Sequence, residues 1–138
     1  MHNITYKMDC NNVNWAEMRQ TLIEDDFDNE RTVEQYKISF ENSAKVCIAY
    51  DGDKIIGTVR ALSDGVCNAY IVDVWTLSAY RKQGIAREMM RLVTDQLQGQ
   101  HVYLFTDDMM AFYDKLGFKP DGVGMSIVVG DWLQNETR

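Results

Sequence analysis

The stretch Tyr80–Met90, "YRKQGIAREMM", decides the fold because two kinds of pattern meet in it. The residues before it, 68–77, form an apolar run that is typical of a buried strand. From Gly84 onward, apolar residues recur at helical spacing instead. They are Ile85, Met89, Leu92, Val93 and Leu97. The stretch therefore predicts a strand that passes through a short basic turn into an amphipathic helix.

The turn itself has the chemistry of an anion site. The first N–H groups of a helix lack intrahelical partners, and the helix dipole places partial positive charge there. Gly84 would let a ligand approach the backbone closely, and Arg81 and Lys82 add positive charge. The sequence predicts a phosphate site here, with an ordinary turn carrying a solvated basic pair as the alternative. Neither a Walker loop nor a three-glycine dinucleotide pattern is present.

Three strands are expected before the turn, over 45–51, 54–63 and 68–77. The first two flank an Asp-Gly pair, which is a strong hairpin signal, and "SDGVCN" marks a second turn. These runs predict an antiparallel meander. The strand, helix and strand between residues 68 and 105 predict a right-handed crossover with parallel pairing.

The remaining segments complete a mixed α/β (α+β) architecture. We expect a central mixed sheet of about six strands, flanked by about four helices, in a single domain over 1–138. Asn14 with Glu17 and Thr32 with Gln35 have the spacing of helix N-caps. The further expected segments are a strand near 3–8, helices over 14–23 and 32–40, a strand over 101–105, a helix over 107–118 and a final strand over 122–129.

Composition restricts the class of protein. The formal net charge of −7 argues against a nucleic-acid binder, which should present a basic face. No apolar run approaches the roughly 20 residues of a membrane helix, and residues 1–9 lack the pattern of a secretory signal. Cys10, Cys47 and Cys67 are too scattered for a disulfide framework or a metal site. We therefore expect a cytoplasmic protein that binds no metal, membrane or nucleic acid.

Two motifs resemble one family. "RKQGIA" fits the pattern [Gln/Arg]-x-x-Gly-x-[Gly/Ala], which is similar to the acyl-coenzyme-A signature of the GNAT superfamily of N-acetyltransferases. "FYDKLGF", Phe112–Phe118, resembles the end of that family's catalytic helix. The resemblance implies the acyl-CoA N-acyltransferase fold. It also implies acetyl-CoA as cosubstrate and direct attack by a primary amine in a ternary complex.

The resemblance also implies which residues hold the cofactor. In the family, the strand before the turn diverges from its neighbour, and its free backbone groups bind the pantetheine arm. By position, the cofactor-binding residues would be Val74, Trp75, Thr76, Arg81, Lys82, Gln83, Gly84, Ile85, Ala86, Thr106 and Phe112. This chain departs from the family in two places. Leu77-Ser78-Ala79 stands where a proline is frequent, and Thr106 stands where asparagine is usual.

Two residues are candidates for catalysis. The resemblance implies that Tyr113 is the general acid that protonates the departing thiolate, with simple aromatic packing as the alternative. Asp73 lies inside an apolar strand, where a carboxylate is costly unless it is paired or functional. It could act as the base or hold the substrate ammonium. Pairing with a nearby arginine such as Arg60, or exposure to water, is equally open.

The acceptor and the partners are less specified. The acidic run over 24–30 could attract a cationic amine, although such a run is more often a solvated surface. A small-molecule amine and a protein amine are both compatible with it, and so is a homodimer. The alternative function is a non-catalytic acyl-CoA-binding module on the same scaffold. A nucleotide-handling enzyme is disfavoured, because no Gly-Lys-Ser/Thr loop is present.

Overall fold

The computed structural model describes residues 3–134. These residues divide into two compact units, of which the first ends at Leu104 and the second begins at Phe105. The expectation of a single domain over 1–138 stays a prediction. Within the described part of the chain, no helix is both long and apolar enough to cross a bilayer.

The first unit is built on a five-stranded sheet whose strands lie in chain order. The strands are β1 (Ile4–Lys7), β2 (Lys45–Asp51), β3 (Lys54–Ser63), β4 (Asn68–Thr76) and β5 (His101–Tyr103). Each of the first four pairs antiparallel with the next, and β4 pairs with β5 in parallel. The predicted meander and the predicted parallel crossover are both confirmed.

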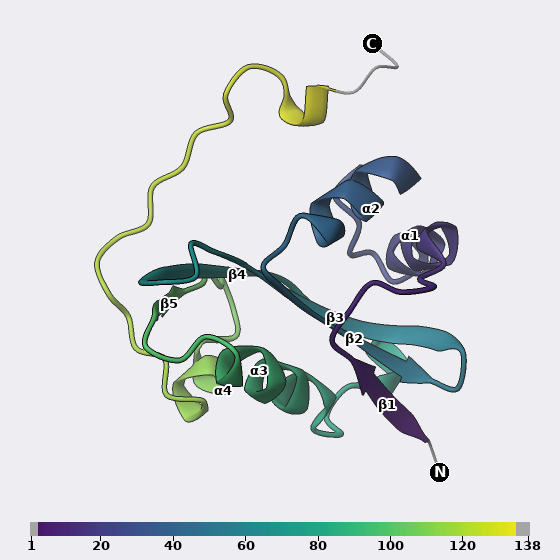
Figure 1. Cartoon of the computed structure of the whole chain (residues 1–138), viewed down its shortest axis with the longest axis horizontal. Helices are drawn as coiled ribbons and strands as arrows, with labels where there is room; N and C mark the ends of the chain where they lie inside the picture. The colour runs from purple at the N-terminus through teal and green to yellow at the C-terminus, as the bar shows by residue number, and fades with distance from the viewer. Residues whose placement is uncertain (1–2, 135–138) are drawn as a thin grey trace. The chain divides into compact units, whose positions relative to one another are not determined.

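Three helices cover the two faces of this sheet (Figure 1). Helices α1 (Trp15–Glu24) and α2 (Val33–Glu41) lie on one face, and α3 (Ile85–Asp95) lies on the other. The predicted caps are present: Asn14 accepts a hydrogen bond from the Glu17 N–H, and Thr32 and Gln35 form a capping box. One main cluster of buried side chains joins α1 and α2 to the sheet, and it includes Met18, Tyr36, Phe40 and Trp75.

A glycine lets α3 approach the sheet closely. A Cβ at Gly57 on β3 would lie 2.9 Å from Met89 Cε on α3 and 3.1 Å from the Trp75 carbonyl oxygen. Both contacts are closer than ordinary packing permits. The helix that begins after the basic turn is therefore seated over β3, and it also contacts β2 and β4 on either side.

The second unit contains α4 (Met110–Lys115) and the 3₁₀ turn η2 (Trp132–Gln134). Helix α4 starts later than predicted, because the Thr106 hydroxyl accepts a hydrogen bond from the Met109 N–H and holds the preceding residues in a turn. Residues 122–129 form no strand, although all of them are described. That expectation is wrong here, because an alternating pattern becomes a strand only where another strand pairs with it. The sheet consequently has five strands rather than about six.

Candidate functional site

The edge of β4 is open along its second half. Its first three residues pair with β5, from Asn68 opposite His101 to Tyr70 opposite Tyr103. Because β5 ends at Tyr103, the six residues from Ile71 to Thr76 have no partner in β5. The pairing of β4 with β5 therefore stops after Tyr70, and the divergence that the family resemblance implied stays a prediction. An open edge exposes backbone N–H and C=O groups that can bind an extended ligand.

A β-bulge determines which groups face that edge. Asp73 has a φ of +56° where the register of β3 and β4 shifts between Thr58 and Arg60, and the Thr58 hydroxyl donates to the Asp73 carbonyl at 2.8 Å. Beyond the bulge, the Leu77 N–H donates to the Ile56 carbonyl of β3 at 2.8 Å. Backbone groups alternate along a strand. The N–H and C=O groups of Val74 and Thr76 consequently point away from β3, toward the open edge.

The basic turn leads from this edge into α3. It includes the 3₁₀ turn η1 (Ser78–Tyr80) and two residues in the left-handed region, Lys82 with φ +65° and Gly84 with φ +83°. Gly84 is the N-cap of α3, and no side chain caps the helix. Lys82, Gln83 and Gly84 are exposed, and a Cβ at Gly84 would meet nothing within 4 Å. Successive N–H groups in such a turn form a concave anion site.

Arg81 and Asp25 hold the turn against the end of β4. The Arg81 Nε donates to the Thr76 carbonyl at 3.0 Å, and its guanidinium lies 3.5 Å from the Asp25 carboxylate. Asp25 also accepts hydrogen bonds from the Trp75 indole at 2.9 Å and from the Ser78 N–H at 3.2 Å. The Arg81 side chain thus fixes the turn to the end of β4 and to Asp25. The backbone N–H groups of the turn and the Lys82 side chain are then available to bind an anion.

Asp25 was missed by sequence reasoning, which placed it in an acidic surface run. Its carboxylate is only 9% exposed. Burial raises the pKa of Asp25, but hydrogen bonds from Ser78 and Trp75 outweigh that effect and hold the pKa below its usual range. Trp75 is 2% exposed and belongs to the core, so only its backbone can meet a ligand. No local pattern could have identified a contact that spans 50 positions.

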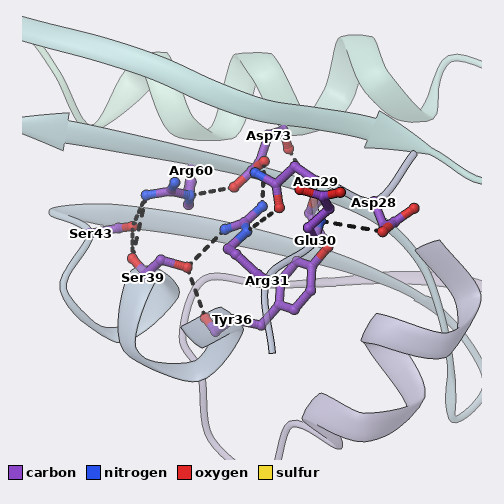
Figure 2. A network of polar contacts seen from close by, with 10 residues as sticks. Asp28, Asn29, Glu30, Arg31, Tyr36, Ser39, Ser43, Arg60 and Asp73 are labelled. Carbon is purple, nitrogen blue, oxygen red and sulfur yellow. Dashed lines mark hydrogen bonds and ion pairs between the residues drawn. The ribbon is translucent and has the colours of Figure 1, made fainter. Parts of the chain in front are cut away.

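Asp73 is paired with two arginines (Figure 2). Its carboxylate oxygens lie 2.9 Å from an Arg31 terminal nitrogen and 2.5 Å from Arg60 Nε, and Arg31 also donates to the Ser39 hydroxyl. All three charged side chains are at most 14% exposed. The pairing with Arg60 is the alternative that the sequence left open. Arg31, which belongs to the loop between α1 and α2, was not anticipated.

Thr76 carries an unsatisfied polar atom beside the turn. Its hydroxyl is buried and finds no hydrogen-bond partner among residues 3–134. Thr76 is in register with Gly57 and so shares the face of the sheet that α3 covers. A buried hydroxyl without a partner is costly unless a ligand satisfies it. Together with the uncapped α3 and the open space at Gly84, this hydroxyl fits an acyl-CoA bound along the open edge.

The remaining predicted residues belong to the second unit. Tyr113 on α4 is buried, and its ring makes edge-on contacts with Phe112 and Phe118 at centroid distances of 5.0 and 6.0 Å. Burial raises the pKa of the Tyr113 phenol, so it stays protonated at neutral pH. Thr106 contacts the start of α4 through its hydroxyl. Within residues 3–134 there is no group of three or more His, Cys, Asp or Glu side chains placed to hold a metal ion.

Comparison with known proteins identifies the family. A model of the Acetyltransferase (GNAT) family matches residues 10–118. That range covers most of the chain and includes both motifs of the sequence analysis. The chain therefore belongs to the GNAT acetyltransferase family.

Relatives and solved structures agree with this assignment. The chain is 31% identical over 124 residues to the uncharacterized N-acetyltransferase ycf52 of Gracilaria tenuistipitata var. liui, a match that covers 83% of this chain and 61% of that protein. The chain spans 52% to 64% of the length of three curated relatives that it matches, and 30% of the length of the GCN5-related N-acetyltransferase 2, chloroplastic, of Arabidopsis thaliana.

The fold also matches solved structures of the family. A GNAT-family acetyltransferase from Streptococcus pneumoniae TIGR4 superposes with a TM-score of 0.79 at 23% identity, covering 94% of this chain and all of that one. Glucosamine-6-phosphate N-acetyltransferase from Arabidopsis thaliana superposes with a TM-score of 0.69 at 17% identity, covering 93% and 99%. At these sequence identities, the two structural superpositions establish the fold alone.

Proposed function

We propose that this protein is an N-acetyltransferase that moves an acetyl group from acetyl-CoA to a primary amine. One observation carries the proposal: the open edge of β4 leads through the basic turn to the N-terminus of α3, which no side chain caps. An edge of free backbone groups suits an amide-containing arm, and a helix N-terminus suits a diphosphate. Coenzyme A carries both groups along one chain.

The cofactor contacts follow from this arrangement. The pantetheine arm would pair with the backbone of Val74 and Thr76, and the Thr76 hydroxyl would gain a partner. The diphosphate would rest on the N–H groups between Arg81 and Ala86, with Lys82 adding charge. Ile85 is buried, so it would contribute only its backbone. Gln83 is exposed on the same turn, while Thr106 and Phe112 remain proposed contacts from the second unit.

The reaction then needs few protein groups. The neutral amine nitrogen bonds to the acetyl carbon, the carbon–sulfur bond breaks, and the departing thiolate takes the phenolic proton of Tyr113. The nitrogen loses one proton to water as the amide forms, and a proton from water restores the Tyr113 phenol. The backbone N–H of Val74, which points to the open edge, would stabilise the carbonyl oxygen as it gains charge. Because the pKa of Tyr113 is raised by burial, the phenol carries its proton at the start of each turnover.

Asp73 has a positioning role in this proposal rather than the role of a free base. Both of its carboxylate oxygens are engaged by arginines, and its backbone forms the bulge. Strained backbone conformations of this kind persist only where surrounding contacts impose them. The two ion pairs would therefore keep the bulge in place and aim the N–H of Val74.

The proposed acceptor is a cationic primary amine. Asp28 and Glu30 lie next to the Arg31–Asp73 pair in the loop between α1 and α2 (Figure 2), and Asp26 and Asp28 are exposed. Exposed carboxylates beside a site raise the local concentration of a cation. A small amine fits this proposal, as does a lysine side chain of a protein. The cytoplasm, where free cysteines persist, is the proposed compartment.

Thiol release tests the proposal. The protein is mixed with acetyl-CoA and a panel of polyamines, amino sugars, amino acids and lysine peptides, and free CoA thiol is followed over time. We expect turnover with at least one cationic amine. Tyr113→Phe should lower kcat by about 10²-fold or more, with little change in the Kd for acetyl-CoA, because the phenol acts on the leaving group.

One result would contradict this function, and another would change the role of a single residue. Tight binding of acetyl-CoA without turnover on any amine would favour the non-catalytic binding module instead. Normal turnover by Tyr113→Phe would remove Tyr113 from the role of acid while leaving the acetyltransferase assignment intact.

A further inference from the structure

The buried ion-pair network behind the bulge of β4 holds more positive than negative charge (Figure 2). Arg31 and Arg60 share the carboxylate of Asp73, and the side chains of Arg31, Arg60 and Asp73 are 7%, 13% and 14% exposed. The other groups that accept hydrogen bonds from the two arginines are neutral amide, hydroxyl and carbonyl oxygens. A buried charge is costly unless an opposite charge pairs with it. Within residues 3–134, one positive charge of this network is therefore left without a counter-charge.

The acidic side chains next to the network do not supply that counter-charge. Asp28 and Glu30 lie in the loop between α1 and α2, and both are exposed. The Asp28 carboxylate accepts a hydrogen bond from the Glu30 N–H at 3.3 Å, within the loop itself. Among the described residues, the carboxylate that forms ion pairs with Arg31 and Arg60 is that of Asp73. A further counter-charge would consequently have to come from a ligand.

Arg60 keeps one nitrogen available for such a ligand. Its Nε donates to Asp73, and its Nη1 lies 3.4 Å from the Ser39 carbonyl oxygen. Its Nη2 forms no hydrogen bond with any residue from 3 to 134. This nitrogen is not sealed from solvent, because the sealed side-chain atoms without a partner belong to Tyr36 and Thr76. The Arg60 guanidinium can therefore receive an anion from outside.

An apolar row continues the same face of the sheet. The Arg60 guanidinium lies 5.6 Å from the ring centre of Phe40 on α2, so Arg60 is on the face that α1 and α2 cover. Leu62 follows two positions later on β3 and therefore shares this face. Leu62 is in register with Tyr70 on β4, and Tyr70 is in register with Tyr103 on β5. These three side chains are 36–40% exposed, so a ligand bound at Arg60 can reach them.

The open edge of β4 begins directly beyond this row. Tyr70 is the last residue of β4 that pairs with β5, and Val72 is in register with Arg60. The bulge at Asp73 and the proposed oxyanion donor Val74 follow. A ligand that spans Arg60 and the apolar row therefore lies beside the edge along which the thioester is proposed to sit.

We propose that the acceptor is a free α-amino acid with an apolar side chain. Its carboxylate pairs with the Nη2 side of Arg60, its side chain lies over the row of Leu62, Tyr70 and Tyr103, and its amino group faces the thioester. A carboxylate fits the planar edge of a guanidinium and carries one negative charge, which is the charge that the network lacks. A phosphate dianion would leave an excess negative charge.

This inference rests on the proposed acetyl transfer and narrows its acceptor. The products are the N-acetyl amino acid and free CoA, with one proton released to water.

Calorimetric titration tests the carboxylate contact without any turnover. Leucine, leucinamide and 3-methylbutylamine share an amine and an apolar side chain, but only leucine has a carboxylate. Leucine should bind the protein saturated with CoA about 30-fold more tightly than the other two, because a charge-assisted hydrogen bond is lost in both. The titration is repeated without CoA, so that a failure of the cofactor proposal does not conceal the contact. Equal or weaker binding of leucine would overturn the inference.

Turnover separates a failure of this inference from a failure of the proposed function. With acetyl-CoA, kcat/KM should be about tenfold or more higher for leucine than for glycine, because glycine leaves the apolar row uncovered. A preference for amines without a carboxylate, or for glucosamine 6-phosphate, would overturn the amino acid as acceptor and leave acetyl transfer intact. Turnover on no amine would contradict the proposed function, and the titration would then decide the carboxylate contact alone.

A charge-removing variant distinguishes binding from a structural role of Arg60. In Arg60→Gln, the ratio of kcat/KM for leucine to that for leucinamide should fall about 30-fold, since only leucine loses an ion pair. A merely structural role would lower both values equally and leave the ratio unchanged, which would overturn the inference. Arg91→Gln is the matched control: it removes the same charge from the exposed surface of α3 and should not alter the ratio.

A second pair of variants examines the apolar row and leaves the buried network intact. Leu62→Ala should lower the preference for leucine over glycine about threefold, because apolar contact area is lost. Val66→Ala also shortens an exposed apolar side chain, in the turn before β4, and should leave that preference unchanged. Equal preferences in both variants would overturn the placement of the side chain over the row.

Discussion

Gly84 combines a conformational requirement with a proposed place in the cofactor site. Its φ of +83° is a region that side chains avoid, and the space around its Cβ position is open. Gly99 has nearly the same φ, +82°, and the same open surroundings, but it lies beyond the other end of α3. Substitutions at Gly84 and Gly99 should therefore cause similar backbone strain, whereas only a substitution at Gly84 should disturb the proposed ligand.

Gly84→Glu should weaken acetyl-CoA binding at least tenfold, because it places bulk and negative charge where the diphosphate is proposed to sit. Gly99→Glu should cost similar stability, roughly 1–2 kcal/mol, from the same backbone strain, and should leave the Kd unchanged. Calorimetric titration measures the affinity, and thermal unfolding measures the strain. Equal affinities for the two variants would place the phosphates elsewhere.

Asp73 can be examined without disturbing its backbone, because asparagine tolerates a positive φ as well as aspartate does. Asp73→Asn would leave Arg31 and Arg60 mostly buried without their counter-charge. Breaking a buried ion pair from one side costs about 3–5 kcal/mol, and we expect a loss of stability toward the lower end of that range. Chemical denaturation measures it.

The same variant distinguishes positioning from base catalysis. If Asp73 aims the bulge, Asp73→Asn should lower kcat and keep the shape of the pH–rate profile. Loss of the ascending limb of that profile in the variant would instead identify Asp73 as the base.

At the scale of elements, Asp25 joins the end of α1 to the turn between β4 and α3. Because the folded pKa of Asp25 is depressed, the fold stabilises its ionised form. The contribution is therefore present above the unfolded pKa, about 3.9, and is lost as the pH falls through the lower folded value. The basic turn between β4 and α3 should therefore become less ordered in acid.

Asp25→Asn should reduce stability at pH 7 by about 1–2 kcal/mol, since hydrogen bonds to a charged acceptor are weakened. The difference in Tm from the unmodified protein should shrink below pH 4. Asp26→Asn is the matched control: it makes the same change at the next position, which is exposed. A similar loss of Tm in both variants would mean that the contacts of Asp25 with the turn between β4 and α3 do not stabilise the fold.

Sequence patterns predicted correctly those helix ends that are fixed by contacts between near neighbours in the chain. The caps at Asn14 and Thr32 need contacts over three residues, and both are present. The links from Asp25 to Trp75 and from Arg31 to Asp73 span 50 and 42 positions. Spacing along the chain carries no signal for them, because the fold brings them together.

At the scale of the whole molecule, two of the three cysteines allow opening of the sheet to be measured. Cys47 on β2 is fully buried, and burial raises the pKa of its thiol to about 12. Cys67 is exposed in the turn before β4. A buried thiol with so high a pKa provides almost no thiolate at pH 8.

An aromatic disulfide reagent at pH 8 should therefore label Cys67 in the folded protein and label Cys47 only when the sheet unfolds. The rate at Cys47 should match the rate of global unfolding measured by tryptophan fluorescence. A variant with both Cys10→Ser and Cys67→Ser leaves Cys47 as its single cysteine and isolates the slow phase. Rapid labelling of Cys47 in that variant would mean that β2 opens without global unfolding.

The sequence by itself determined the order of the elements in the first unit, the turn that leads into α3 and the family. These depend on periodicity, caps and short motifs, which act between near neighbours in the chain. Tertiary structure alone decided that Asp25 contacts Trp75, that Arg31 contacts Asp73, and that residues 122–129 form no strand. The reason is that ion pairs and strand pairing depend on which distant segment lies opposite, and local patterns do not encode that partner.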